Sequence, residues 1–249
     1  MVEEAAEAGI ERVIVVTSRG KESIAAYFQA MPDLEERLAD SGATALAAKV
    51  RAAAEIAKVS FVIQEQPLGL GHAVLTAEEA VAGEPFVVIL PDDIIAHSPG
   101  VVAQMLVVHE NTGGGVVAVE PMPWERVHNY GVVDATPVDD RVHQIHGLVE
   151  KPSRREAPSN LTIVGRYILP PEIFDDLRRT PPGTNGEIQL TDALVLLLEH
   201  HELYAYEFLG TRYDGGTPLG LLRASLEFGL AREDTRQEVL ALLKTLQPE

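Results

Sequence analysis

Two adjacent carboxylates, Asp92 and Asp93, follow directly after an apolar run at residues 86–90 and Pro91. Apolar runs of this length are typical of buried strands, and ligands of doubly wound sheets bind beyond the carboxyl ends of such strands. Mg²⁺ prefers one or two carboxylates together with phosphate oxygens of a substrate, so this pair could hold a metal ion. Pro-Asp-Asp is also good turn chemistry, so a plain turn is the alternative interpretation.

A third carboxylate, Asp214, precedes a Gly-Gly pair and follows a strand expected at residues 203–210. It is a candidate for a second metal ligand facing Asp92, because both carboxylates come just after expected strands. An Asp-Gly turn is the alternative for this residue.

A glycine-rich turn connects an expected strand at 60–66 to an expected helix at 73–82. Gly69 and Gly71 bracket one residue in this turn. Glycines before a helix let a flat or anionic ligand approach bare backbone N–H groups. Gln64 offers both a donor and an acceptor to the edge of a nucleobase. A tight connection and a solvated strand end are the alternatives for these residues.

The second half of the chain contributes further polar candidates. Glu150 could accept hydrogen bonds from two sugar hydroxyls, and Lys151 supplies a point charge suited to a phosphate. A Glu-Lys pair beside a proline is otherwise an ordinary surface edge. Thr191 and Asp192 stand near the start of an expected helix, where capping is a sufficient role. The eight histidines show no convincing metal-ligand spacing on a shared face, so we assign them no role.

The elements that must position these residues alternate between strand and helix in the first half of the chain. Strands are expected at 11–17, 60–66, 86–90 and 114–122, and helices at 1–9, within 21–58, at 73–82 and at 100–111. Such alternation predicts an α/β sheet with parallel strand order.

After residue 122 the pattern changes. We expect a hairpin at 130–152, a strand at 160–170, helices at 171–179 and 188–200, a strand at 203–210 and a helical remainder. No repeat, low-complexity segment or obvious linker divides the chain. We therefore predict a single domain over residues 1–249, with a nucleotide-binding half at about 1–122 and a substrate-binding half with C-terminal helices at about 123–249.

Composition excludes several classes of function. The net charge of −18 argues against nucleic-acid binding, because phosphate backbones require clustered Lys and Arg. Anionic small molecules remain allowed, since a few cations or a divalent metal can hold them. The absence of cysteine excludes disulfides and thiolate metal sites and fits a reducing compartment. With no visible signal peptide or membrane-spanning run, we expect a soluble, cytoplasmic protein.

Seven segments, taken together and in their order along the chain, resemble a known family, although no single segment is specific enough to do so. They are QPLGLGHAV, VILPDD, YGVVD, VEKP, APSNLTIVGRYIL, TPPGTNGEIQLTDAL and YDGGTPLG. Together they resemble bacterial UTP–glucose-1-phosphate uridylyltransferases, a branch of the sugar-nucleotide pyrophosphorylase family, over nearly the whole chain. That resemblance implies an α/β, Rossmann-like nucleotidyltransferase fold with a mixed sheet flanked by helices.

The resemblance also implies a reaction and a set of site residues. An oxygen of glucose 1-phosphate would attack the α-phosphorus of UTP with Mg²⁺ as cofactor, giving UDP-glucose and pyrophosphate. Asp92, Lys151 and Asp214 would be the catalytic residues, with Mg²⁺ on Asp92 and Asp214. The implied substrate-binding residues are Gln64 and Gly71 at the uracil, Asp93 near the sugar or ribose, Gly131 and Glu150 at the glucose, and Gly165.

The chain departs from the family pattern at its start. The family opens with a strand and a G-x-G-T-R loop that wraps the triphosphate, whereas Met1 aligns within the helix that follows this loop. Losing one charge-stabilising donor in such sites costs on the order of 10²–10³ in rate, so we expect very low activity. Without the first strand, exposed backbone groups and apolar faces predict aggregation. We therefore hypothesise that this chain is a fragment, or a mis-started reading, of a complete enzyme.

Other interpretations stay open. One is another sugar-1-phosphate nucleotidyltransferase, which uses dTTP or a further nucleotide. A second is a non-catalytic relative that binds a sugar nucleotide or a partner protein, and a third is a generic Rossmann-like binding domain. The resemblance implies a homo-oligomer, although a chain without the first strand need not assemble.

Overall fold

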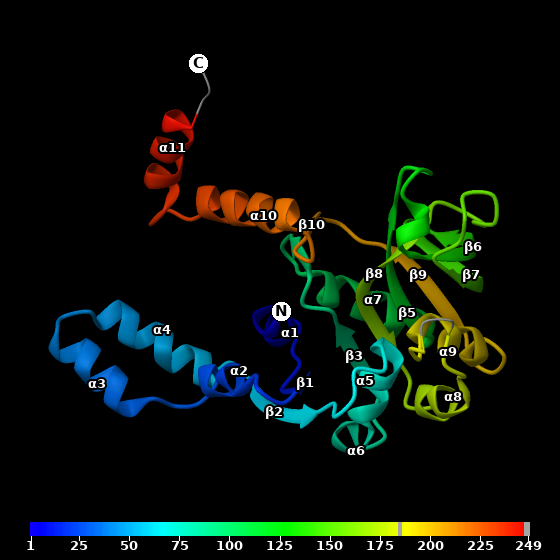
Figure 1. The fold of residues 1–249 in the computed structure, drawn as a ribbon, viewed down its shortest axis with the longest axis horizontal. Helices are drawn as coiled ribbons and strands as arrows, with labels where there is room; N and C mark the ends of the chain where they lie inside the picture. The colour runs from blue at the N-terminus through cyan, green and yellow to red at the C-terminus, as the bar shows by residue number, and fades with distance from the viewer. Residues whose placement is uncertain (184–185, 247–249) are drawn as a thin grey trace.

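The chain folds around a six-stranded mixed sheet in which late strands are inserted between early ones (Figure 1). The computed structural model describes residues 1–183 and 186–246. The strand order across the sheet is β3-β8-β5-β9-β7-β6. These strands are β3 (Phe86–Ile89), β5 (Gly115–Pro121), β6 (Gly131–Asp139), β7 (Val142–Glu150), β8 (Leu161–Leu169) and β9 (Leu203–Glu207). The predicted α/β class with a mixed sheet flanked by helices is confirmed.

Strand directions correct the expectation of parallel order. β3 and β5 point the same way, but β8 lies between them and runs antiparallel to both. Among the described strands, parallel pairing joins β5 to β9, and β1 (Arg12–Thr17) to β2 (Lys58–Ile63). Alternation of strand and helix predicts the direction of successive strands, but it does not predict that a strand from the second half becomes their common neighbour.

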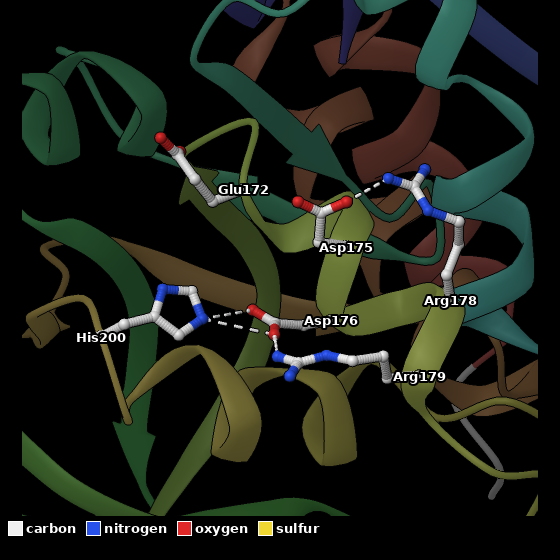
Figure 2. Close-up of a pocket in the computed structure, with 6 residues that line it drawn as sticks. All are labelled: Glu172, Asp175, Asp176, Arg178, Arg179 and His200. Atoms are coloured by element: carbon white, nitrogen blue, oxygen red, sulfur yellow. Dashed lines mark hydrogen bonds and ion pairs between the residues drawn. The ribbon is translucent and has the colours of Figure 1, made fainter.

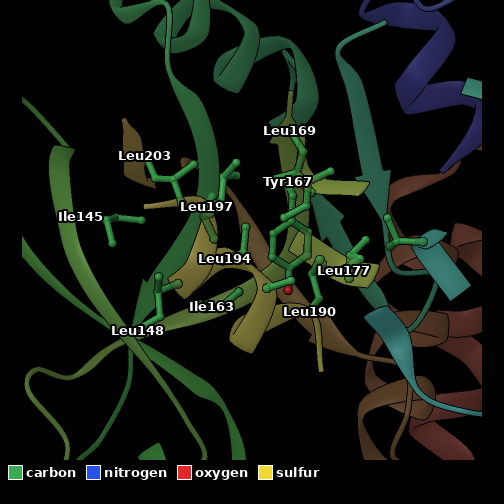
Figure 3. Packing of buried hydrophobic residues seen from close by; sticks show 14 of the residues in the cluster. Ile145, Leu148, Ile163, Tyr167, Leu169, Leu177, Leu190, Leu194, Leu197 and Leu203 are labelled. Atoms are coloured by element: carbon green, nitrogen blue, oxygen red, sulfur yellow. The ribbon is translucent and has the colours of Figure 1, made fainter. Parts of the chain in front are cut away.

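Helices cover both faces of the central strands, so alternate side chains of β8 enter two different cores. Ile163, Tyr167 and Leu169 pack in the core that contains the helices α5, α8 and α9 (Figure 3). Val164 and Ile168 pack in the core on the opposite face, with α7. Burial on both faces explains why this strand reads as a nearly continuous apolar run. These helices are α5 (Leu70–Thr76), α7 (Val101–Thr112), α8 (Ile173–Arg179) and α9 (Leu190–Leu197).

Two smaller sheets accompany the main one. The strands β1 and β2 form one, and β4 (Asp93–Ala96) pairs antiparallel with β10 (Thr211–Asp214) in the other. Neither β4 nor β10 is expected from the sequence, because each strand has only four residues and a charged residue at its edge. The expected helix at 73–82 is divided at Ala77 into α5 and α6 (Glu78–Val81).

The remaining helices lie outside the sheet. They are α1 (Val2–Glu7), α2 (Glu22–Tyr27), α3 (Pro32–Asp40), α4 (Thr44–Glu55), the 3₁₀ helix η1 (Val127–Asn129), α10 (Pro218–Ala231) and α11 (Arg236–Thr245). The last two helices extend away from the sheet at the top of Figure 1. Within the described part of the chain, no helix has both the length and the apolar character needed to cross a membrane.

A fully buried arginine joins α1 to the centre of the sheet. The guanidinium of Arg166 in β8 donates to Glu4 Oε1 at 3.1 Å and to Glu4 Oε2 at 2.9 Å. It also donates to the carbonyl oxygens of Leu90 at 3.2 Å, Gly165 at 2.9 Å and Asp93 at 3.0 Å. A buried cation is tolerated when it is paired and hydrogen-bonded, and here Glu4 supplies the opposite charge. Arg166 thereby holds the segment that leads from β3 into β4.

Candidate active site

Asp92 and Asp214 come together at one end of the ribbon formed by β4 and β10. Asp93 is paired in register with Asp214, and Gly215 donates its N–H to the Asp92 carbonyl at 2.7 Å. A Cβ built on Gly216 would stand 3.2 Å from Asp214 Oδ1 and 3.5 Å from Asp92 Oδ2. Both carboxylates therefore border one small space. Their role as metal ligands stays a prediction.

The donor set at this space suits a metal ion that is shared with a substrate. Among residues 1–183 and 186–246, no group of three or more His, Cys, Asp or Glu side chains is arranged to hold a metal. Mg²⁺ characteristically uses one or two protein carboxylates and completes its shell with water and phosphate oxygens. Two converging carboxylates therefore fit such an ion better than they fit a structural metal enclosed by protein ligands.

A cavity of about 300 Å³ lies where β6 begins, β7 ends and α9 begins. Within it, Glu150 Oε2 accepts a hydrogen bond from Thr191 Oγ1 at 2.7 Å, and Glu150 Oε1 lies 3.4 Å from Lys151 Nζ. A Cβ on Gly131 would stand 3.2 Å from Thr191 Oγ1 and 3.3 Å from Glu150 Oε2. The glycine therefore leaves room beside a fixed carboxylate, which can accept hydrogen bonds from a polyhydroxyl ligand.

The backbone of Lys151 is held in an unusual conformation. Its φ is 47°, in the left-handed region that non-glycine residues rarely occupy. Its N–H donates to the carbonyl of Tyr130 at 3.1 Å, directly before β6. Such conformations persist where the surroundings over-determine them and are frequent at ligand sites. The structure thus fixes this exposed cation at the edge of the cavity.

Tyr167 places a buried hydroxyl at the cavity. Burial raises the pKa of its hydroxyl, and the negative charges of Glu150, Asp93 and Asp92 raise the pKa further. The hydroxyl stays protonated at neutral pH and is available as a donor. Leu90, which stands two residues before Asp92, also lines the cavity, so the cavity adjoins the segment that carries this carboxylate.

Sequence reasoning missed Tyr167 and gave Thr191 only a capping role. A tyrosine inside the apolar segment 161–169 looks like an ordinary core residue. One signal could have indicated it: Tyr167 stands two residues after Gly165, so both face the same side of a strand. From the sequence, capping the N-terminus of the helix is a sufficient role for Thr191. In the structure, its hydroxyl instead donates a hydrogen bond to Glu150. Only the tertiary contact reveals that role.

Asp93 and Gly165 are engaged with each other and with the protein. Asp93 Oδ2 accepts the N–H of Gly165 at 2.8 Å, and Asp93 Oδ1 accepts from Arg212 Nε. Gly165 must be a glycine here, because an added Cβ would stand 2.5 Å from Leu90 Cβ and 2.8 Å from Asp93 Oδ2. Packing therefore explains both residues. The expected place of Asp93 near the sugar or ribose and the expected substrate binding by Gly165 stay predictions.

Gln64 contacts the two residues that flank Leu70 and Gly71 in the chain. Gln64 Nε2 donates to the Gly69 carbonyl at 3.2 Å and lies 2.9 Å from His72 Nδ1. Gly71 donates its N–H to the Ile188 carbonyl at 2.8 Å, and a Cβ on Gly71 would stand 2.8 Å from the same oxygen. The glycine lets two backbones approach closely. Contact of these residues with uracil stays a prediction.

A larger cavity of about 520 Å³ is formed by charged residues that already neutralise one another (Figure 2). The fully buried Asp176 is paired with Arg179 and lies 3.1 Å from His200 Nε2. Arg178 is paired with Glu78 at 2.6 Å and also with Asp175. Because these charges are paired within the protein, we place the candidate active site at the smaller cavity.

Comparison with known protein families identifies the family to which this chain belongs. The family model described as nucleotidyl transferase matches residues 1–229. The chain belongs to the nucleotidyl transferase family. The family predicted from the seven segments is thereby confirmed. Nucleotidyl transferases generally use a divalent metal ion, which agrees with the pair of carboxylates.

Individual nucleotidyl transferases resemble the chain over nearly its full length. It is 41% identical over 247 residues to the UTP–glucose-1-phosphate uridylyltransferase of Bacillus subtilis (strain 168), with 99% of this chain and 84% of the relative covered. A UTP-bound UGPase from Acinetobacter baumannii is 37% identical with a TM-score of 0.89, over 99% of this chain and 88% of that one. A UDP-glucose pyrophosphorylase complexed with UDP-glucose is 40% identical with a TM-score of 0.83, over 93% and 85%.

Proposed function

We propose that the chain transfers the uridylyl group of UTP to glucose 1-phosphate, giving UDP-glucose and pyrophosphate, with Mg²⁺ as the divalent ion. The names of its relatives support the substrates. The observation that carries the proposal is the cavity lined by Glu150, Lys151 and Leu90, because Leu90 stands just past the end of β3, only two residues before Asp92. A nucleotidyl transfer needs a metal position and a sugar position that adjoin in this way.

The reaction in this proposal is a direct displacement at phosphorus. A phosphate oxygen of glucose 1-phosphate forms a bond to the α-phosphorus of UTP, and the bond from that phosphorus to the bridging oxygen of the β-phosphate breaks. Glu150, held by Thr191, accepts hydrogen bonds from the glucose, while Lys151 neutralises its phosphate. Positioning and charge neutralisation carry most of such a transfer. A divalent ion held by Asp92 and Asp214 would supply positive charge to the phosphate oxygens.

The proposal also assigns parts of the fold to each substrate. Residues at about 1–122 would bind the nucleotide through Gln64 and Gly71, and residues at about 123–249 would bind the sugar through Gly131 and Glu150. Both halves would act as one domain, since β8 from the second half pairs with β3 and β5 from the first. We place the reaction in the cytoplasm, where both phosphorylated substrates are retained by their charge.

The test is turnover by the purified chain with UTP, glucose 1-phosphate and Mg²⁺, followed by chromatography of UDP-glucose and by pyrophosphate release. We expect UTP to be preferred over dTTP and ATP, and Asp92→Asn and Asp214→Asn each to lower the rate at least tenfold. Asp234→Asn, which changes an exposed carboxylate on the turn after α10, is the matched control.

Binding of UDP-glucose is measured by calorimetry alongside turnover, so that ligand binding and chemistry are separated. Binding without any detectable turnover would favour the non-catalytic relative. A preference for dTTP would assign the chain to another sugar-1-phosphate nucleotidyltransferase. Failure to bind UDP-glucose by a folded protein would refute the proposal.

A further inference from the structure

The ribbon of β4 and β10 carries the two proposed metal ligands at one end. In the described part of the chain it forms a sheet of its own, apart from the six-stranded sheet. Its register places Asp93 opposite Asp214 and Ile95 opposite Arg212. In an antiparallel pair, opposite residues share a face, and so do residues two apart on one strand. Asp93 and Arg212 are therefore diagonal neighbours on one face of the ribbon.

Arg212 contacts three elements outside its own strand. Its side chain is only 8% exposed, and its Nε donates to Asp93 Oδ1 in β4. Its Nη1 lies 3.7 Å from Glu120 Oε2 at the end of β5. The guanidinium carbon lies 5.2 Å from the centre of the Tyr130 ring, within the range of a cation–π interaction. The planar guanidinium can make all three contacts at once, which an ammonium group cannot do.

Two of these three contacts, those with Asp93 and Tyr130, lead onward to residues of the proposed active site. Asp93 is the first residue of β4 and directly follows Asp92 in the chain. The carbonyl of Tyr130 accepts the N–H of Lys151, which has the left-handed backbone. One side chain thus connects the strand that follows Asp92 with the loop that fixes Lys151.

The electrostatics of this arrangement indicate positioning and not simple stabilisation. Asp93 and Arg212 form an ion pair with side chains only 10% and 8% exposed. The desolvation of such pairs offsets most of their attraction, so they stabilise a fold weakly compared with apolar residues of similar volume. Groups around a metal site orient its ligands, and loss of a direct partner of a ligand typically lowers metal affinity or activity about 10–100-fold. Arg212 acts one step further away, because it hydrogen-bonds Asp93, the chain neighbour of the proposed ligand Asp92.

We propose that Arg212 is a positioning residue that holds the Asp92 and Asp214 carboxylates in register with Lys151. The inference rests on the proposed function, because it concerns the same metal position and the same phosphate cation. Arg212 acts through Asp93 and Tyr130, and it maintains the distance between the part of the site that binds the metal and the part that binds the sugar phosphate.

The test is Mn²⁺ binding to the full chain, measured by electron paramagnetic resonance with and without UDP-glucose. We expect Arg212→Met and Arg212→Lys each to weaken Mn²⁺ binding about tenfold or more. Arg223→Met is the matched control, because the exposed Arg223 stacks on Tyr213, on the other face of the same ribbon, and should leave Mn²⁺ binding within twofold.

A double variant separates positioning from folding. Arg212→Met alone leaves the buried Asp93 without its cation, whereas Asp93→Asn with Arg212→Met removes both charges together. We expect the double variant to regain the thermal midpoint of the parent chain while its Mn²⁺ binding stays weak. Recovery of both properties would show that Arg212 only serves stability and would overturn the inference.

Variants of the two proposed metal ligands distinguish a failure of the proposed function from a failure of the positioning role of Arg212. If Asp92→Asn and Asp214→Asn do not change Mn²⁺ binding, the metal assignment of the proposed function fails. If these two variants weaken Mn²⁺ binding and both Arg212 variants bind it within twofold of the parent, the positioning role fails alone. In turnover, positioning also predicts a lower kcat for Arg212→Lys with KM for glucose 1-phosphate changed less.

Discussion

Replacing Gly165 with alanine should strongly destabilise the fold, because β8 lies directly beside the end of β3 and Leu90, without space for a side chain at this position. The new Cβ would stand 2.5 Å from Leu90 Cβ and 2.8 Å from Asp93 Oδ2. Carbon atoms in contact are normally about 3.5–4.0 Å apart, so one backbone must move by about 1 Å. That movement also loosens the hydrogen bond from the Gly165 N–H to Asp93, now 2.8 Å.

The size of the effect follows from these two losses. Overpacking in a core costs about 1–3 kcal/mol, and weakening a hydrogen bond to a charged group costs about 1.5–3 kcal/mol. Alanine also restricts the unfolded chain more than glycine does, which offsets about 0.4–1 kcal/mol of this loss of stability. We therefore expect Gly165→Ala to lower the free energy of unfolding by about 2–5 kcal/mol. In a chain of this size the thermal midpoint should fall by roughly 5–15 °C.

Urea and thermal unfolding followed by circular dichroism measure this change, and Gly147→Ala in β7 is its control. A Cβ on Gly147 would have Asp134 Cβ as its nearest atom, at 3.8 Å, which is an ordinary contact. The control should be neutral or slightly more stable than the parent, since alanine suits a strand better than glycine. If Gly165→Ala unfolds within 1 °C of Gly147→Ala, the steric argument is wrong.

Three further changes test other contacts. Arg166→Met should lower the free energy of unfolding in urea by about 3–5 kcal/mol, because Glu4 would lose its partner in a largely buried position; a loss below about 1 kcal/mol would contradict this. Thr191→Val should raise KM for glucose 1-phosphate up to about tenfold with little change in kcat, since Glu150 would lose one hydrogen bond that holds it; an unchanged KM in initial-rate measurements would refute that role. Burial raises the pKa of Glu120 above its ordinary value of 4.5, so the folded chain keeps this proton at a pH where the unfolded chain has released it. The contribution of Glu120 to stability is therefore greatest below the ordinary value and is lost as pH rises through the raised one. In urea titrations, Glu120→Gln should accordingly gain stability relative to the parent as pH rises from the ordinary pKa through the raised one. A difference in the free energy of unfolding between variant and parent that does not change with pH would show that the pKa of Glu120 is not raised.

The sequence predicted those elements whose local pattern is strong. The hairpin expected at 130–152 appears as β6 and β7, and the strand expected at 160–170 appears as β8, each within one or two residues. The hairpin shows period-two alternation, and the strand at 160–170 is a nearly continuous apolar segment. The order of strands in the sheet could not be predicted, because pairing of β8 with β3 and β5 depends on long-range packing and not on local pattern.

The residues of the candidate site were also predicted only in part from the sequence. The resemblance singled out Asp92 and Asp214, and the structure brings these two carboxylates to one space. Tyr167 and Arg212 escaped notice, because an isolated tyrosine or arginine in a strand has many ordinary roles. Each becomes informative only through neighbours distant in sequence, such as Asp93 for Arg212. Residue types and spacing reveal groups that act on a ligand more readily than groups that hold them in place.

The insertion of β8 between β3 and β5 has a consequence for synthesis on the ribosome. β3 and β5 are complete by residue 121, yet their shared neighbour spans residues 161–169, and β9 at 203–207 follows later still. Until β8 emerges, the nascent chain exposes unpaired edges on two apolar strands, a state prone to association with other chains. Non-local pairing of this kind also slows folding after release. The first 122 residues thus cannot finish their own sheet, and productive folding waits for the second half of the polypeptide.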